Sequence, residues 1–251
     1  MSLPAPSADT TAVVTGASSG IGVEIARELA RRGHGVTLVA RREDRLVALA
    51  GELADRHGVR TEVVAADLGD EAARTRVVDT LGERGLRASV LVNNAGLSTM
   101  GPVAASDPGA ELGMIRIDVE AVVHLCSALV PAMVAAGAGA VLNVASTAAF
   151  QPLPGQAGYG ASKAFVLSYT QALATELHGT GVSATTLCPG PVRTEFGEKA
   201  GISQEDAESS LPSFMWVTAE EVARQAVAAL DAGRPVVIPG TPNRVAAGFA
   251  H

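Results

Sequence analysis

A regular alternation of short apolar segments with longer amphipathic ones limits the folds open to this chain. Seven short segments rich in valine, leucine and alanine are predicted as strands, at 12–16, 35–40, 61–67, 89–96, 140–146, 182–190 and 235–240. Helical patterns follow the first six, at about 20–32, 42–56, 70–84, 108–136, 157–178 and 218–231. Near-continuous apolar strands that alternate with helices indicate a parallel sheet covered on both faces. Because parallel crossovers are right-handed, the sequence predicts an α/β fold with a doubly wound sheet.

One domain is expected for the 251 residues, because a chain of this length buries a large core and no shift in composition marks a second unit. Residues 1–10 have neither a basic start nor an apolar stretch and are predicted as a loose tail. The segment 191–217, rich in glycine, serine, glutamate and proline, is too long for a passive connection. It is predicted as a lid over a substrate.

Charge and cysteine content narrow the partners and the location. A net charge of −7 and a pI near 5.2 argue against nucleic acid as a partner. The hydropathy pattern predicts no membrane-spanning helix. Cys126 and Cys188 lie in apolar runs without metal-ligand spacing, so we expect buried free thiols, a cytoplasmic location and no bound metal.

The segment Tyr159-Gly160-Ala161-Ser162-Lys163 places a phenol and an ammonium four residues apart, on one face of a predicted helix. A free tyrosine has a pKa of about 10, and a neighbouring cation lowers that value towards the range useful for acid–base chemistry. The chain has 17 arginines and only two lysines, so a lysine here suggests a task for a compact charge. The alternative is chance, because this spacing alone is common.

A glycine-rich turn follows the first predicted strand, as Thr15-Gly16-Ala17-Ser18-Ser19-Gly20-Ile21-Gly22. Glycines allow close backbone approach, and the following helix N-terminus offers unpaired N–H groups to a pyrophosphate. Asp67 ends the third predicted strand, where an adenine amino group could be met. Asn93-Asn94-Ala95-Gly96 ends the fourth, at the edge where such sheets bind ligands, although it could equally be a turn for its own sake.

The end of the second predicted strand bears on the choice of dinucleotide. An acidic residue there would accept hydrogen bonds from a ribose 2′-hydroxyl, but the sequence has Arg41 and Arg42 instead. Two guanidinium groups suit a 2′-phosphate, so NADP(H) is favoured over NAD(H). The alternative is a solvated helix start in which Arg42 pairs with nearby acids.

Together these motifs resemble the short-chain dehydrogenase/reductase family over residues 10–240. In order, the chain carries TGASSGIG, Asp67, NNAG, Ser146, Tyr159-x-x-x-Lys163 and Pro189-Gly190. The resemblance implies a single-domain, Rossmann-like sheet of strand order 3-2-1-4-5-6-7 and hydride transfer between a nicotinamide and a carbonyl or alcohol. It implies Tyr159 as the acid/base, Lys163 as the group that holds the nicotinamide ribose and lowers the tyrosine pKa, and Ser146 as a donor to the substrate oxygen. The cofactor-binding residues are then Gly16, Ser18, Ser19, Gly20, Ile21, Gly22, Arg41, Arg42, Asp67, Leu68, Asn94, Ala95, Gly96, Tyr159, Lys163, Pro189, Gly190, Val192 and Thr194.

One position departs from the family pattern. The family has an asparagine in the long fourth helix, where it supports a proton relay from the lysine through water. By the family's spacing from Ser146, this chain has Asp118 at that place, with Glu120 as the alternative if the registration slips by two. Asp118 is therefore the fourth predicted catalytic residue, and the relay is the part of the mechanism that the change puts in question.

The sequence also suggests a class of substrate and an oligomeric assembly. The predicted lid ends in 211–216, which holds the only tryptophan, so an apolar ketone or a 3-oxoacyl compound is expected, unless these residues only seat the lid. Small residues in the helices at about 108–136 and 157–178 suggest a homodimer or homotetramer. A non-catalytic dinucleotide-binding sensor or assembly protein of the same fold is the alternative function.

Overall fold

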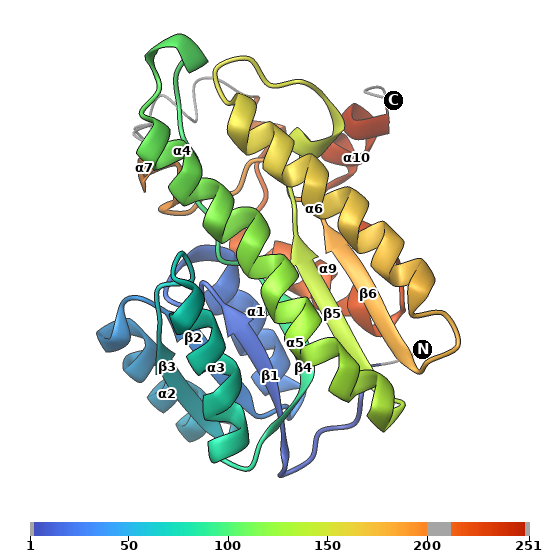
Figure 1. The fold of residues 1–251 in the computed structure, drawn as a ribbon. Coiled ribbons are helices and arrows are strands. Elements are labelled where there is room, and N and C mark those ends of the chain that lie inside the picture. The colour runs from blue at the N-terminus through green and yellow to red at the C-terminus, as the bar shows by residue number, and fades with distance from the viewer. Residues whose placement is uncertain (1–2, 200–211, 249–251) are drawn as a thin grey trace.

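The computed structural model describes residues 3–199 and 212–248, and it contains a seven-stranded parallel sheet. The strand order is β3-β2-β1-β4-β5-β6-β7, which confirms the order implied by the resemblance (Figure 1). The strands are β1 (Thr10–Thr15), β2 (Val36–Ala40), β3 (Thr61–Ala65), β4 (Arg87–Asn93), β5 (Gly139–Val144), β6 (Val182–Leu187) and β7 (Val236–Val237). The order reverses between β1 and β4, and open sheets bind ligands at the carboxyl ends of such neighbours.

Helices cover both faces of this sheet, so the predicted doubly wound α/β fold is confirmed (Figure 1). One face is covered by α3 (Glu71–Glu83), α5 (Ala121–Ala136) and α6 (Ala157–Glu176). The other is covered by α1 (Gly20–Arg31), α2 (Glu43–His57) and α9 (Ala219–Asp231). Shorter helical segments are α4 (Pro108–Ile115), α7 (Phe196–Lys199), α10 (Thr241–Gly248) and the 3-10 turns Val103–Ala105, Thr147–Phe150 and Ser213–Met215.

The strands divide their side chains between two apolar cores. In β1, Val13 packs on the α3, α5 and α6 side, whereas Ala12 and Val14 pack on the α1, α2 and α9 side. All three side chains are fully buried. Successive strand residues point to opposite faces, and both faces are covered, so each strand reads as an unbroken apolar run in the sequence.

The helical stretch 108–136 differs from the expectation in two ways. A π-helical turn, Arg116–Glu120, separates α4 from α5. By length and composition alone, the stretch is also long and apolar enough to cross a membrane. Its second half, α5, contains no Asp, Glu, Lys or Arg. The hydropathy prediction did not take this uncharged segment into account. In the fold, Leu125, Leu129 and Met133 of α5 pack into the core against the sheet. Contact with the sheet thus accounts for the apolar residues on the inner face of this helix.

Both ends of the described chain make contacts that the sequence did not predict. Within the expected loose tail, 1–10, the Leu3 side chain packs against the core and its N–H donates to Asp231 Oδ1 at 2.9 Å, while residues 3–9 form no helix or strand. Thr10 already belongs to β1. At the other end, α10 was not predicted, and it lies beside the 3-10 turn Ser213–Met215.

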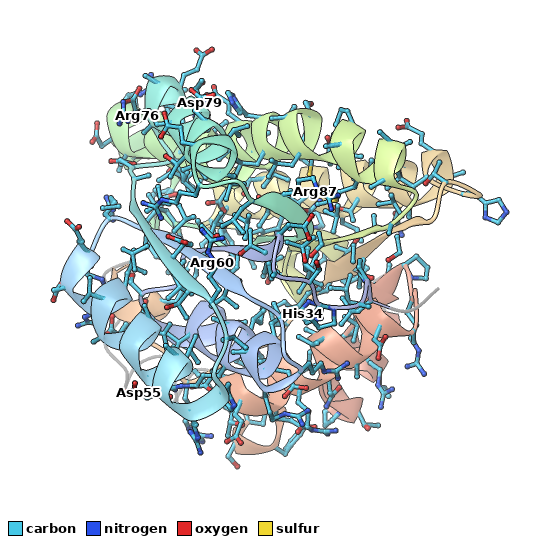
Figure 2. The ribbon with its side chains drawn as sticks, turned by 90° about the horizontal axis from the view of Figure 1, so that it is seen from below. His34, Asp55, Arg60, Arg76, Asp79 and Arg87 are labelled. Atoms are coloured by element: carbon cyan, nitrogen blue, oxygen red, sulfur yellow. The ribbon has the colours of Figure 1, made fainter. Side chains whose placement is uncertain are left out.

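Charged side chains gather at the amino ends of the strands. Figure 2 views the molecule from below, where Arg60 and Arg87 lie at the starts of β3 and β4. Arg60 pairs with Glu62 at 2.8 Å and Arg87 pairs with Asp9 at 2.6 Å. Exposed pairs of this kind each contribute about 1 kcal/mol or less. The candidate site lies at the opposite, carboxyl edge.

Candidate active site

A cavity of about 660 Å³ opens at the carboxyl edge of the sheet. Its walls come from the turn after β1, the ends of β2 to β6, the start of α6 and the helix α10. Apart from Gly22 and Asp118, every residue predicted from the sequence for catalysis or cofactor binding lines this cavity. Residues spread over most of the chain therefore meet in one place.

The glycine-rich turn leaves room that side chains would fill. Gly16 has a φ of +66°, and a Cβ built there would lie 2.7 Å from Asn94 Nδ2. At Gly22 a Cβ would lie 2.4 Å from the Gly16 carbonyl oxygen, so Gly22 supports the turn from behind and does not line the cavity. The turn leads directly into the N-terminus of α1 at Gly20. A bare backbone cradle ending in a helix N-terminus fits a pyrophosphate.

Asn94 fixes the end of β4 against this turn. Its Nδ2 donates to the Thr15 carbonyl oxygen at 2.9 Å, and its backbone N–H donates to Thr15 Oγ1, also at 2.9 Å. The Ala95 N–H shares the same hydroxyl at 3.0 Å. Thr15 thus joins the two predicted cofactor segments, a role that the sequence argument did not assign to it.

The two arginines at the end of β2 have different surroundings. The Arg42 guanidinium donates to Ser18 Oγ from Nε at 3.2 Å and from Nη2 at 3.1 Å, and Nη1 donates to Glu195 Oε2 at 3.0 Å. Arg41 is exposed beside the cavity and makes no hydrogen bond or ion pair with the part of the chain that the structure describes. The alternative expected from the sequence is a solvated helix start in which Arg42 pairs with nearby acids. Arg42 does pair with an acid, but this acid, Glu195, lies in the loop after β6.

Ser146, Tyr159 and Lys163 come together at the other end of the cavity. Ser146 follows β5; its hydroxyl accepts a hydrogen bond from the Ala148 N–H at 3.1 Å and lies close enough to Tyr159 to lower the pKa of the phenol. Tyr159 and Lys163 share one face of α6, with Lys163 Nζ 5.5 Å from the centre of the tyrosine ring. Two hydroxyl groups and a cation are thus gathered where a carbonyl oxygen could be bound and protonated.

Asp118 lies behind this group and does not line the cavity. Its Oδ2 is 2.9 Å from Lys163 Nζ, and both side chains are buried. Its Oδ1 accepts a hydrogen bond from the Leu97 N–H at 2.8 Å. The π-helical turn places the carboxylate at this position between α4 and α5. The registration on Asp118 is supported by this contact, because Glu120 is half exposed and pairs instead with Arg74 at 3.5 Å.

Burial, the charges of Asp118 and Lys163, and the Ser146 hydroxyl set the acidity of Tyr159. Burial raises the pKa of Tyr159 above its usual value, and the Asp118 carboxylate adds to the rise, whereas Lys163 and the Ser146 hydrogen bond act against it. Burial alone would lower the pKa of Lys163, but Asp118 and Tyr159 outweigh it and raise that pKa. The lysine therefore stays charged.

Several lining residues were missed by the sequence argument. Gln156 lines the cavity and donates from Nε2 to Ser98 Oγ at 2.7 Å. Asn243 of α10 lines it too, although it lies almost at the end of the chain and carries no motif. The thiol of Cys188 is buried beside the site, and burial raises its pKa to about 12, so it stays protonated. These residues reach the site through contacts between distant parts of the chain, and no local sequence motif marks them.

The predicted lid, 191–217, is described at its two ends only, because residues 200–211 lie outside the described part. Val192 and Val217 form a parallel bridge, and the Val217 N–H donates to the Pro191 carbonyl oxygen at 3.1 Å. Within the described ends, Phe196, Met215 and Trp216 line the cavity. Leu211, which was part of the apolar prediction, falls outside the described residues.

Known proteins resemble this chain in sequence. The model of the short chain dehydrogenase family matches residues 10–205. Sulfoacetaldehyde reductase 2 of Chromohalobacter salexigens is 42% identical over 189 residues, which cover 73% of each chain. A very-long-chain 3-oxoacyl-CoA reductase of Anas platyrhynchos is 34% identical over 88% of this chain and 69% of its own length.

Solved structures of known proteins are similar to this chain in fold. A short-chain dehydrogenase from Sphingobium yanoikuyae in complex with NADPH is similar with a TM-score of 0.85 and 36% identity, over 96% of this chain and 92% of that one. The motifs, the strand order, the family match and this similarity all agree. The chain therefore belongs to the short-chain dehydrogenase/reductase family and is an oxidoreductase that acts on alcohol and carbonyl groups.

Proposed function

We propose that this enzyme uses NADP(H) in preference to NAD(H) and interconverts an apolar ketone, or a 3-oxoacyl compound, and the corresponding secondary alcohol. The observation that carries the proposal is a single cavity with Ser146, Tyr159 and Lys163 at one end and Arg41 and Arg42 at the other. Groups placed in this way along one cavity suit a dinucleotide laid along the carboxyl edge of the sheet. A nicotinamide dinucleotide, when bound, would supply or accept the hydride.

The chain's own part in the reaction is proton transfer and charge stabilisation. A carbonyl oxygen that is being reduced gains negative charge, and donors already held in place stabilise it by several kcal/mol. Ser146 is the donor that stays protonated. Tyr159 gives up its proton to that oxygen in reduction and accepts it in oxidation. Lys163, kept charged by Asp118, favours the phenolate form of the tyrosine.

The preference for NADP(H) rests on charge at the end of β2. Arg41 and Arg42 present two guanidinium groups, and Ser18 offers a hydroxyl beside Arg42. Such groups bind a phosphate dianion through charge-assisted hydrogen bonds. The bound NADPH of the Sphingobium yanoikuyae enzyme supports the same choice by similarity.

The substrate class rests on the lining of the opposite end. Leu153, Phe196 and Met215 line the cavity on the side of Tyr159, and the Phe196 ring centre lies 6.0 Å from that of the tyrosine. Apolar walls around a few donors favour ligands with one polar group on an apolar body. A relative named as a very-long-chain 3-oxoacyl-CoA reductase supports the 3-oxoacyl version.

The test is oxidation of NADPH and of NADH by the purified protein with medium-chain ketones, cyclic ketones, aldehydes and a 3-oxoacyl thioester. The proposal expects turnover with NADPH and a member of the ketone or 3-oxoacyl set. Tight binding of NADPH without oxidation by any of the compounds would contradict it and would fit the non-catalytic alternative.

The assembly and the location are part of the same proposal. Val134 of α5 and Phe165 of α6 are exposed apolar side chains on the outer side of these helices, which supports a homodimer or homotetramer formed through them. Two buried free cysteines support a cytoplasmic location. Light scattering that gives a monomer at micromolar concentration, or fractionation that finds the protein outside the cytoplasm, would contradict these two statements.

A further inference from the structure

Glu195 is the carboxylate in the arginine cluster at the adenosine end of the cavity. It follows Thr194 in the loop after β6, and it reaches across to the start of α2. Its Oε2 accepts from Arg42 Nη1 at 3.0 Å and its Oε1 accepts from Arg45 Nη1 at 2.7 Å. Hydrogen bonds from Arg45 and then Arg42 lower the pKa of Glu195 to about 2, so the carboxylate is charged at any working pH.

The bonds of Arg42 leave little of its guanidinium for a new anion. Ser18 takes the edge formed by Nε and Nη2, and Glu195 takes Nη1. A phosphate binds guanidinium best through two parallel hydrogen bonds to one edge. Each edge of Arg42 already has at least one nitrogen engaged, so a phosphate that pairs with Arg42 in this way has to displace a partner.

Of the two partners, Glu195 is the one that a phosphate would repel. Ser18 is neutral and can donate its hydroxyl proton to a phosphate, whereas Glu195 is an anion. Arg45 gives Glu195 a second cation to stay with once Arg42 is released. All three side chains of this ion-pair group are between about a third and a half exposed, at 32%, 40% and 46%, so a small rearrangement is open to them.

We propose that Glu195 is a specificity-determining residue that competes with a 2′-phosphate for Arg42, and that Glu195 stays paired with Arg45 when the phosphate binds. This inference rests on the proposed preference for NADP(H). The strength of the NADP(H) preference then depends on the loop after β6, which carries Glu195, as well as on the arginines at the end of β2. The same loop carries Pro189, Gly190 and Thr194, and Thr194 lies against Gly20, where a Cβ would be 3.1 Å from its methyl carbon.

The test measures binding of two matched probes by calorimetry, with no turnover. Adenosine 2′,5′-bisphosphate carries the 2′-phosphate and AMP lacks it, so the ratio of their dissociation constants isolates the 2′-phosphate. Glu195→Gln should increase the advantage of the bisphosphate about three- to tenfold, because it removes one charge near the phosphate on a partly exposed surface. AMP affinity should stay within twofold.

Two further variants separate competition from a simple change in net charge. The double variant Glu195→Gln/Arg45→Gln has the same formal charge as the wild type, yet it frees Arg42, so it should still favour the bisphosphate more than the wild type does. Glu221→Gln removes an equivalent exposed carboxylate from the pair with Arg224 on α9, at 2.6 Å, and should leave both affinities unchanged.

The outcomes distinguish this inference from the proposed function. If the wild type prefers the bisphosphate but Glu195→Gln leaves the ratio unchanged, or the double variant equals the wild type, the competition is refuted and the NADP(H) preference stands. If the wild type shows no preference but Glu195→Gln gains one, the competition stands and the proposed preference is wrong. No preference in either protein refutes both, and equal weakening of both probes by Glu195→Gln would make Glu195 a structural brace only.

Discussion

Replacement of Asp118 by asparagine tests how the buried ion pair sets the acidity of Tyr159. The substitution keeps the size of the side chain and an acceptor for the Leu97 N–H, but it removes the charge 2.9 Å from Lys163 Nζ. Asp118 raises the pKa of Tyr159 and also raises that of Lys163. Without it, the pKa of the tyrosine should fall, because the lysine's pull on the phenolate is no longer partly cancelled.

The size of the shift follows from Coulomb's law. Lys163 Nζ contacts the Asp118 carboxylate at 2.9 Å and lies 5.5 Å from the centre of the tyrosine ring, so a carboxylate at most about 8 Å from that ring centre is the relevant case. At an effective dielectric constant of about 20, a unit charge at such a distance contributes roughly 2 kcal/mol. The neighbouring lysine responds in part, so we expect a smaller net effect, in the direction of a lower tyrosine pKa.

The assay is the pH dependence of kcat/KM in both directions. Alcohol oxidation needs the phenolate, so its half-maximal point should move to lower pH in Asp118→Asn. Ketone reduction needs the phenol, so its decline at high pH should also begin at lower pH. Glu120→Gln is the matched control, because Glu120 lies on the same π-helical turn but pairs with Arg74. An unchanged midpoint, or a shift to higher pH, would refute the electrostatic role of Asp118.

Three other predictions concern the proton donor, the cofactor and the substrate. Tyr159→Phe should lower kcat at least a hundredfold while NADPH titrations stay within twofold of wild type, and retention of a tenth of the rate would reject Tyr159 as the acid/base. Arg41→Ala should raise the KM for NADPH roughly ten- to a hundredfold and leave that for NADH within twofold; equal losses for both cofactors would count against the reading of β2. Medium-chain or cyclic ketones should give a higher kcat/KM than small polar sugars, and the reverse ranking would reject the apolar pocket.

The sequence predicted the sheet and most of the candidate site because both depend on local patterns. Strands buried on both faces are continuous apolar runs, and the motif residues lie at the ends of these strands, which a parallel sheet brings to one edge. The i, i+4 spacing of Tyr159 and Lys163 needed only a helix to place them together.

The contacts that the sequence did not reveal join segments far apart in the chain. Glu195 meets Arg42 across 153 positions, and nothing in the neighbourhood of either residue marks the pairing. Asn243 reaches the cavity only because α10 packs beside the lid end, where its Nδ2 donates to the Met215 carbonyl oxygen at 3.0 Å. The apolar stretch of α5 is a further case, since composition alone does not say whether such a helix is covered by protein or by lipid.

The bridge between Val192 and Val217 has a consequence for how enzymes of this build can diverge. Because both ends of the intervening segment are pinned at one point, its length and composition can change at a small entropic cost and without displacement of the sheet. The segment between the two valines can therefore be exchanged as a unit in evolution or by engineering. The hydroxyl groups of Ser146 and Tyr159 and the ammonium group of Lys163 lie outside it and stay unchanged. Chimaeras joined at these two valines should inherit substrate range from the donor and proton chemistry from the host.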